Sequence, residues 1–596
     1  MVGVMGRAGV IVMVLAAALA GGAVVLAAPD LLQQAQHEAS AAGEAAGREQ
    51  RLSPPDGGAH EPPSSSQVVE DDDEENAPLD ARTARWAGAA YDFLQSMSCK
   101  SPSWTTEEAC LDARRIPRRA MRVWAARAGR RYVARLPDGA LQRSGVHDGV
   151  LLLDPFPDAS WGHLVLVFFV AANTTLGRCA DKKGFWLEPG DCLTVALKER
   201  CQNLLDRRGR RRNYSRRCEI NFPPLVVTEE DARTPYRLHA FTHAHGHGPI
   251  RSEALKQRLK CRSDAAGYAP CAHLRPLNDT EHLVCDPLGV NSKRCSPTHE
   301  TIHTRCRLFE VCDQAVVLSG GWSRDLSPEV TRDNVKLAYN MLRHNGFHKG
   351  NIKIFYANGA KKDADPELRH AVYPSSMKLG VRYHLRSLCA TPLCTDSLVL
   401  YLAGPTLNDA TLLLWDQDRN GLLRGGEVYT PRELLRDLEN CAARQVTVLV
   451  DTSYAGELVQ AFAHSKKHKN VQVYAAGGSD DYSWGTEFTR HWTHYSHTHS
   501  CTRQVHETSL SAVRLSTPAA FDGSGGELRK TIFGAPCDVS PPFSWRELHH
   551  SYLGCQNTPT AIWLRAGASN FSPPDLRDII DEFFPPQTGE RSASEQ

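Results

Sequence analysis

The residues with the clearest chemical spacing form a twelve-residue run of oxygen-bearing side chains, DQDRNGLLRGGE, at 416–427. Oxygen ligands fall at positions one, three and five, glycine at six and glutamate at twelve, as in an EF-hand calcium loop. The predicted ligands are Asp416, Asp418, Asn420, the Leu422 carbonyl and a bidentate Glu427. Residues 411–415 read as a strand rather than a helix, and Arg424 adds positive charge, so a solvated polar turn remains the alternative.

Two groups of closely spaced histidines could bind a transition metal, because neutral imidazoles are ligands for zinc and copper. The first group contains His239, His243, His245 and His247, and the second contains His491, His494, His497 and His499. The surrounding residues are rich in threonine, serine and glycine, which is also typical of solvated loops. Zinc or copper binding is therefore one of two interpretations of each group.

Two apolar runs end in short motifs that could position catalytic groups. Residues 397–402 lead into Gly404-Pro405-Thr406, and residues 446–450 lead into Asp451-Thr452-Ser453. In an open α/β sheet, chemistry gathers at the carboxyl ends of the strands. We therefore expect the two motifs to lie at the same edge of one sheet.

This pair of motifs resembles the clan of cysteine peptidases that contains caspases, metacaspases, legumains and the catalytic subunit of the GPI transamidase. In that clan one strand ends in a Gly-His-Gly type motif with the general base, and the next ends in an Asp-x-Cys type motif with the nucleophile. The resemblance covers about residues 314–507, including the run 471–478 and the segment 479–484, where the clan builds part of its substrate pocket. It implies a mainly parallel sheet flanked by helices.

Both positions that would carry catalysis hold other residues. Pro405 replaces the histidine and has neither a titratable group nor a backbone N–H. Ser453 replaces the cysteine, and a serine hydroxyl needs an adjacent base more than a thiol does. We predict a pseudo-peptidase that acts as a binding or scaffold protein. The alternative is a hydrolase or transamidase that uses Ser453 with a base from elsewhere in the chain.

The N-terminus and the cysteines predict the secretory pathway. Arg7 precedes an apolar run, 9–28, which fits a signal peptide and is also long enough for a single-pass type II anchor. The 18 cysteines lack repeated CxxC pairs, which favours disulfides over zinc. N-glycosylation sequons begin at Asn173, Asn213, Asn278 and Asn570. The polar tail excludes a GPI signal, so we expect a secreted, extracellular, luminal or type II membrane protein.

Arginines gather at two places, although the formal net charge of +1 gives no global field for nucleic acid. The run Arg207–Arg212 could contact sulfated glycans, be cleaved by a convertase, or form an exposed loop tied by Cys201 and Cys218. A second set could extend a glycan-binding patch and comprises Arg114, Arg115, Arg118, Arg119 and Arg122.

The order of apolar and polar segments divides the chain into five parts. After the signal or anchor (1–28) we expect a disordered linker (29–81) with an acidic run at 70–75. A disulfide-rich mixed α+β domain (82–312) precedes the α/β caspase/legumain-like domain (313–570) and a tail (571–596). The predicted helices are 86–97, 116–128, 330–343, 431–443 and 457–462. The predicted strands are 150–153, 163–170, 193–197, 223–227, 315–318, 352–356, 397–402, 446–450, 471–474 and 561–564.

Overall fold

A computed structural model describes residues 79–536 with gaps. The gaps are 101, 103, 140–144, 173, 175–176, 182, 199–218, 234–256, 276–301, 303–311, 360–371, 393, 418–419, 498–499 and 534. Several predictions fall outside the described residues: the linker up to 78, the four sequons, the first histidine group, the run Arg207–Arg212 and the strand 561–564.

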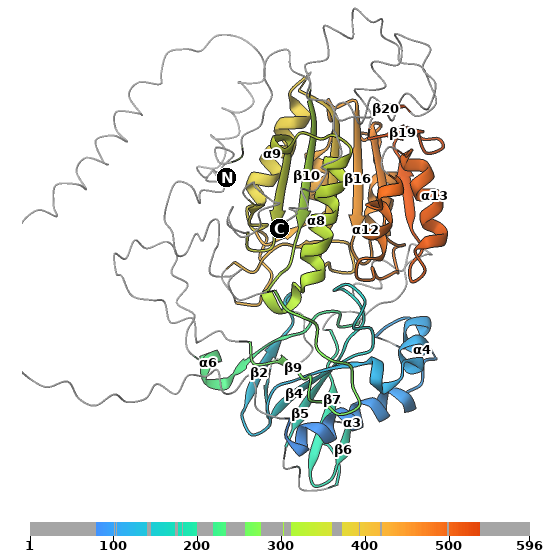
Figure 1. The fold of residues 1–596 in the computed structure, drawn as a ribbon. Helices are drawn as coiled ribbons and strands as arrows, with labels where there is room; N and C mark the ends of the chain where they lie inside the picture. Colours follow the sequence, from blue (N-terminus) through green and yellow to red (C-terminus); the bar gives the residue numbers. More distant parts are fainter. Residues whose placement is uncertain are drawn as a thin grey trace, which may run out of the picture. The chain divides into compact units, whose positions relative to one another are not determined.

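The C-terminal half is built on a seven-stranded sheet in the order β12-β11-β10-β13-β16-β17-β18 (Figure 1). Its strands are β10 (Cys312–Ser319), β11 (Ile352–Tyr356), β12 (Val372–Tyr373), β13 (Thr395–Ala403), β16 (Gln445–Asp451), β17 (Val471–Ala475) and β18 (Ala519–Asp522). Neighbouring strands are parallel except β17 and β18, which are antiparallel. The predicted α/β fold with a mainly parallel sheet is confirmed at this level.

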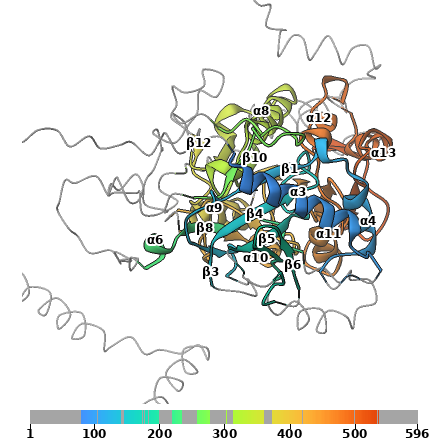
Figure 2. The same ribbon diagram turned by 90° about the horizontal axis from the view of Figure 1, so that it is seen from below.

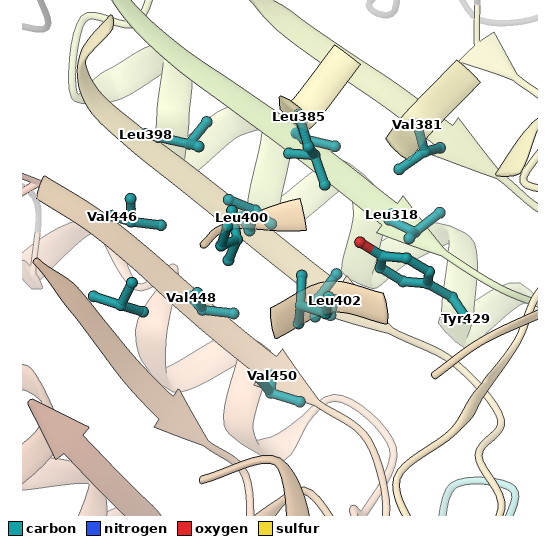
Figure 3. Packing of buried hydrophobic residues seen from close by; sticks show 14 of the residues in the cluster. Leu318, Val381, Leu385, Leu398, Leu400, Leu402, Tyr429, Val446, Val448 and Val450 are labelled. Atoms are coloured by element: carbon teal, nitrogen blue, oxygen red, sulfur yellow. The ribbon is translucent and has the colours of Figure 1, made fainter. Parts of the chain in front are cut away.

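Helices cover both faces of this sheet, and successive strand residues alternate between two cores. On β13, Leu398, Leu400 and Leu402 enter one core, and Val399 and Tyr401 enter the other. The first core, drawn in Figure 3, packs under α9 (Lys378–Ala390), α10 (Pro431–Asp437) and α11 (Gly456–Ala463). The second packs under α8 (Glu329–His344), α12 (Glu487–Trp492) and α13 (Thr502–Ala512). Both faces are buried, which explains the nearly continuous apolar runs in the sequence.

The N-terminal half contains a six-stranded and a three-stranded antiparallel sheet, in the orders β6-β7-β5-β4-β1-β9 and β3-β2-β8. Helix α3 packs across β4 and buries Trp86 and Leu94 in the core of the larger sheet (Figure 2). The elements are α3 (Ala81–Ser96), α4 (Glu107–Arg115), η2 (Arg118–Ala120), β1 (Arg122–Ala125), β2 (Tyr132–Arg135), β3 (Val146–His147), β4 (Gly149–Asp154), β5 (Leu166–Ala171), β6 (Gly184–Leu187), β7 (Asp191–Val195), β8 (Leu225–Thr228), α6 (Glu229–Arg233) and β9 (Lys260–Cys261).

Short elements complete the described chain: η6 (Arg324–Leu326), η7 (Lys349–Asn351), β14 (Leu412–Leu413), β15 (Val428–Tyr429), η8 (Tyr495–His497), β19 (Thr531–Ile532) and β20 (Ala535–Pro536). Disulfides join Cys99 to Cys110, Cys179 to Cys192, Cys261 to Cys271 and Cys389 to Cys441. Disulfides of this number indicate an oxidising, secretory or extracellular environment. Among the helices described, none is long and apolar enough to cross a membrane.

Two helix predictions are wrong in part or in full. Residues 116–128 form η2 and strand β1 rather than a helix, because Val123 and Ala125 pair with β4 and enter the same core as α3. The helix predicted at 431–443 begins at Pro431 with a Thr430–Glu433 capping box but ends at Asp437. Asn440 then has a positive φ of 51°, which no α-helix continues.

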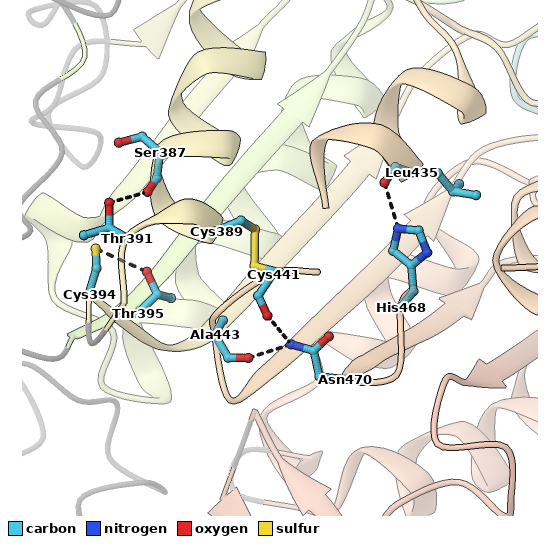
Figure 4. Close-up of a disulfide and its surroundings, with 10 residues drawn as sticks. All are labelled: Ser387, Cys389, Thr391, Cys394, Thr395, Leu435, Cys441, Ala443, His468 and Asn470. Atoms are coloured by element: carbon cyan, nitrogen blue, oxygen red, sulfur yellow. Dashed lines mark hydrogen bonds between the residues drawn. A yellow bond between two sulfur atoms is a disulfide. The ribbon is translucent and has the colours of Figure 1, made fainter. Parts of the chain in front are cut away.

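The chain after α10 is fixed by covalent and polar contacts (Figure 4). The disulfide from Cys441 reaches the end of α9 at Cys389. Asn470 donates through Nδ2 to the carbonyls of Cys441 (3.0 Å) and Ala443 (2.6 Å). These contacts place the start of β16 beside β17 and hold α9 and α10 on one face of the sheet.

A buried ion cluster holds α9 against α10. The Asp437 carboxylate is fully buried and accepts from Arg382 (2.8 and 3.0 Å), Arg386 (2.6 Å) and the Tyr429 hydroxyl (2.9 Å). The hydrogen bonds that Arg382 donates to Asp437 raise the pKa of its guanidinium, against the opposing effect of burial. Arg382 also pairs with Glu433 at 3.0 Å, so loss of the Asp437 charge leaves this mostly buried guanidinium with one carboxylate partner in place of two.

Asp437→Asn should lower the free energy of unfolding by about 3 kcal/mol, because the neutral amide keeps the volume but not the charge that Arg382 needs. Urea denaturation measures this change. The matched control is Asp396→Asn, whose partner Arg444 has a side chain 36% exposed, and which should cost about 1 kcal/mol or less. Equal losses for the two variants would contradict the role given to the buried cluster.

Candidate functional site

The structure brings the two predicted strand-end motifs together. Strands β13 and β16 are adjacent and parallel, with Ala403 opposite Asp451. Pro405 and Ser453 each follow two residues later, so they emerge side by side from strands about 4.8 Å apart. Thr406 Oγ1 donates to the backbone carbonyl of Ser453 at 2.9 Å. The motifs therefore share one edge of the sheet, as the sequence predicts.

The Ser453 hydroxyl is buried and engaged by backbone groups. Ser453 is 0% exposed. The hydroxyl donates to the Ser160 carbonyl (3.4 Å), and its oxygen accepts from the Ser483 backbone N–H (3.1 Å). Within the described residues it has no hydrogen bond to a histidine, carboxylate or lysine. A serine in this setting has no partner that could accept its proton.

The loop between β4 and β5, residues 155–163, covers the strand ends, and we call it the closing loop. Its Ala159 forms an antiparallel bridge with Trp484, and the Ser160 N–H donates to the Ser483 carbonyl. A Cβ atom at Gly162 would lie 2.8 Å from the Thr406 carbonyl oxygen and 3.3 Å from the Ser453 Cβ. Only a glycine allows so close an approach. The N-terminal half thus contacts both strand-end motifs directly.

Aromatic packing joins the closing loop to segment 479–484, which the resemblance places at a substrate pocket. The Phe156 ring lies 5.7 Å from Tyr482 and 6.1 Å from Trp484, measured between centroids. Tyr454, also fully buried, has its ring 5.8 Å from Tyr482, and its hydroxyl donates to Glu219 Oε1 at 3.3 Å. These rings belong to the core around α3 and the larger antiparallel sheet. In this structure the segment packs against protein.

The space beside the motifs is small. A cavity of about 20 Å³ lies between the ends of β13 and β16 and the start of α10, lined by Thr406, Tyr429, Thr452 and Leu458 among others. That volume holds about one water molecule. A peptide side chain is larger than this cavity.

A buried histidine of the closing loop fixes the carbonyl that binds Ser453. His163 Nδ1 lies 2.9 Å from the Ser160 oxygen, and Nε2 lies 2.8 Å from Asp154 Oδ1. Both ring nitrogens therefore face acceptors, which favours the doubly protonated ring. Burial lowers the pKa of His163, but the charge and hydrogen bond of Asp154 outweigh it, so the pKa is raised. Sequence spacing gives no signal for this pair.

Asp451 anchors the segment that binds Ser453 from the other side. Its buried carboxylate accepts from Ser483 Oγ (2.5 Å), from Thr489 Oγ1 and from Asn334 Nδ2 (3.4 Å). Burial raises the pKa of this carboxyl, and the hydroxyl donors offset part of that rise. Asp451 thus positions Ser483, whose backbone N–H reaches Ser453.

The predicted calcium loop spans the turn between β14 and β15, so a strand rather than a helix precedes it, as the sequence predicts. Asp416 accepts from the N–H groups of Asn420 (3.2 Å) and Gly421 (2.7 Å). Glu427 accepts from those of Gln417 and Arg424, both at 3.0 Å.

The other predicted ligands of this loop are only partly described. Asn420 Oδ1 accepts from the Leu422 N–H at 2.8 Å, and Asp418 falls in a gap of the structure. Across the described ranges no group of three His, Cys, Asp or Glu side chains is placed to hold a metal ion. The backbone bonds fit the polar-turn interpretation, and the buried Asp416 and Glu427 fit a hard cation. Calcium binding therefore stays a prediction.

Three members of the second histidine group lie close together. The rings of His491 and His497 are 4.7 Å apart and those of His494 and His497 are 6.1 Å apart. Burial, followed by the charges of the two neighbouring rings, lowers the pKa of His497. His491 Nε2 is occupied by the Val505 carbonyl at 3.0 Å. Zinc or copper binding stays a prediction here, and His499 lies outside the described residues.

Comparison with known proteins identifies no family: no protein-family model matches the chain, and no curated protein matches it. The caspase/legumain-type assignment therefore stays a prediction that rests on the strand-end motifs and their geometry.

Gly162→Ala should destabilise the protein more than Gly129→Ala. Both glycines have positive φ, 104° and 94°, so alanine costs about 1–2 kcal/mol of backbone energy at each. A Cβ at Gly129 meets nothing within 4 Å, whereas one at Gly162 meets the Thr406 carbonyl. The collision should add about 1–3 kcal/mol, measured as the difference between the two free energies of unfolding. Equal effects would show that the closing loop does not press on the strand ends.

Calcium should raise the thermal midpoint of the wild-type protein relative to chelator, and Glu427→Gln should abolish that difference. At a ten-fold excess over the dissociation constant, binding to the native state adds about 1.4 kcal/mol. Glu427→Gln removes the only bidentate candidate and keeps the side-chain length. Glu439→Gln, at an exposed position beyond α10, is the control that should keep the calcium response. Identical melts of the wild type in both conditions would leave the loop as a polar turn.

Proposed function

We propose that this chain is a catalytically inactive, caspase/legumain-like protein of the secretory pathway that acts as a binding or scaffold protein. The observation that carries the proposal is the state of Ser453. Its hydroxyl is buried between the Ser160 carbonyl and the Ser483 N–H, and among the residues that the structure describes no base lies in hydrogen-bond reach. A nucleophile that is neither activated nor accessible does not support acyl transfer.

The family part of the proposal is supported by the position of the motifs. Pro405 and Ser453 occupy neighbouring ends of parallel strands, which is where the clan keeps its histidine and cysteine. Segment 479–484 lies next to Ser453, as the clan's pocket segment would. Helices cover both faces of the sheet. The resemblance to the clan is one of geometry and motif order. With Pro405 and Ser453 in place of histidine and cysteine, the catalytic pair is absent.

The compartment follows from the disulfides at the coarse level of an oxidising environment. Cleaved signal peptide and type II anchor both agree with that environment, and so do N-glycans at the four sequons. The binding role is supported by the frame that the structure describes, an α/β sheet in contact with a disulfide-linked antiparallel half. Calcium at 416–427 would stiffen this frame between β14 and α10.

A hydrolase or transamidase that uses Ser453 is the second candidate, and one observation favours it. His163 of the closing loop forms a buried pair with Asp154 at the end of β4, the kind of pair that activates serine elsewhere. Here both nitrogens of His163 are already engaged, one of them by the Ser160 carbonyl that also binds Ser453. Activity would require the closing loop to rearrange and His163 to lose a proton.

A fluorophosphonate probe should not label Ser453 in the native full-length protein, and Ser453→Ala should leave any labelling unchanged. Accessibility has its own test, in which Ser453→Cys is treated with a thiol reagent. It should react at least about 100-fold more slowly than Ser511→Cys, an exposed position on α13, because reaction at position 453 needs local opening. Reproducible fluorophosphonate labelling that disappears in Ser453→Ala would establish the hydrolase instead.

A further inference from the structure

Four arginines cluster at the end of α4 and on η2, and we call Arg114, Arg115, Arg118 and Arg119 the arginine surface. Arg115, Arg118 and Arg119 are exposed and Arg114 is half-buried. Arg114 and Arg119 make no hydrogen bond or ion pair with any residue that the structure describes. Arg115 pairs with Asp112 at 3.2 Å, but both side chains are largely exposed, so solvent screens that pair. The cluster therefore keeps most of its positive charge for a ligand.

The elements that carry the arginine surface are held rigidly. Helix α4 is capped by Thr106 and tied by the Cys99–Cys110 disulfide. The Arg118 guanidinium lies over the Tyr268 ring at 4.4 Å, and Tyr268 belongs to a loop closed by the Cys261–Cys271 disulfide. Stacking fixes the plane of the guanidinium, and a side-chain hydrogen bond to Tyr268 holds it in place while its other N–H groups remain available. A preorganised cation loses less conformational entropy when it binds an anion.

The fifth arginine of the sequence pattern has a different role. Arg122 begins β1 and donates to the carbonyls of Pro270 (2.9 Å) and Pro157 (3.3 Å). Its hydrogen bonds join the loop of Tyr268 to the closing loop, so its side chain is used inside the fold. We therefore leave Arg122 out of the arginine surface.

Helix capping does not account for the whole cluster. Cations stabilise the carboxyl end of a helix, and this explains Arg114 and Arg115 in the last turn of α4. The dipole effect fades within that turn, and Arg118 and Arg119 lie beyond it, on η2. These two cations exceed the helix requirement and form no ion pair with an acidic side chain in the described part of the chain, which points to a function outside the fold.

We propose that the arginine surface binds a sulfated glycan. Guanidinium groups match the oxygens of sulfate with paired N–H donors, better than lysine does. The disulfides indicate an oxidising environment, where sulfated glycans are the abundant linear polyanions and nucleic acids are not. This binding is independent of the strand-end site and goes beyond the scaffold role proposed above, because it names a ligand class and a surface.

The experiment measures binding of a heparin octasaccharide to the full chain at several salt concentrations. It uses a background in which Arg210, Arg211 and Arg212 are replaced by alanine, because that run could itself bind the probe. In this background Arg114→Ala with Arg119→Ala should weaken binding roughly ten-fold and flatten its salt dependence, since fewer counterions are released. The matched control is Arg432→Ala with Arg436→Ala, two exposed arginines of α10, which should leave binding unchanged. Equal thermal midpoints verify that the variants fold.

Three results would overturn the proposal. One is that the background protein does not bind the octasaccharide at physiological salt. Another is that the test and control pairs lose affinity equally, which would mean that only net charge matters. The last is that a desulfated octasaccharide or vesicles containing phosphatidylserine bind as tightly as the sulfated probe, which would assign the surface to general anion or membrane contact. Loss confined to the test pair and to the sulfated probe supports it.

Discussion

The backbone N–H and carbonyl of Ser160 make the contacts on which the arrangement of the strand ends depends. Its N–H donates to the Ser483 carbonyl, and its carbonyl accepts from both Ser453 and His163. Backbone N–H and C=O groups that are shielded from water must both find partners. Ser160 finds them on the parallel sheet and on its own loop. Moving the closing loop away would leave these groups, and the Asp154–His163 pair, without partners in a low-dielectric interior.

The same contact opposes catalysis at Ser453. A nucleophilic serine needs its proton directed at a base, but here that proton is directed at an amide carbonyl, which does not accept protons at ordinary pH. His163 is linked to Ser453 through the Ser160 carbonyl, and its two N–H groups already donate to Ser160 and Asp154. Pro405, at the position where the resemblance expects a histidine, also offers no base, so this residue and the closure of the site act in the same direction.

Local patterns in the sequence predicted the strands of the parallel sheet well. They did not predict the contacts between segments that lie far apart in the chain. The strand 352–356 and the Thr430 cap were predictable because apolar runs and capping residues act over a few positions. The helix prediction at 116–128 failed because Val123 and Ala125 bury themselves by pairing with β4, which local propensity does not register. The Ser453–Ser160 bond spans 293 positions, and no spacing rule reports a contact of that kind.

The turn at 416–427 is mechanically connected to the helices that cover the sheet. Lys378 at the start of α9 donates to the Gly425 carbonyl at 2.6 Å and pairs with Glu433 of α10 at 2.7 Å. Tyr429 lies on β15, two residues after the turn, and its hydroxyl donates to the buried carboxylate of Asp437. A change in the shape of the turn must therefore either move Lys378 or break its hydrogen bond to the Gly425 carbonyl. The ion cluster around Asp437 resists movement of Lys378. This coupling explains how the turn keeps its shape although no helix precedes it. In that shape the carboxylates of Asp416 and Glu427 are buried and accept from backbone N–H groups of the turn.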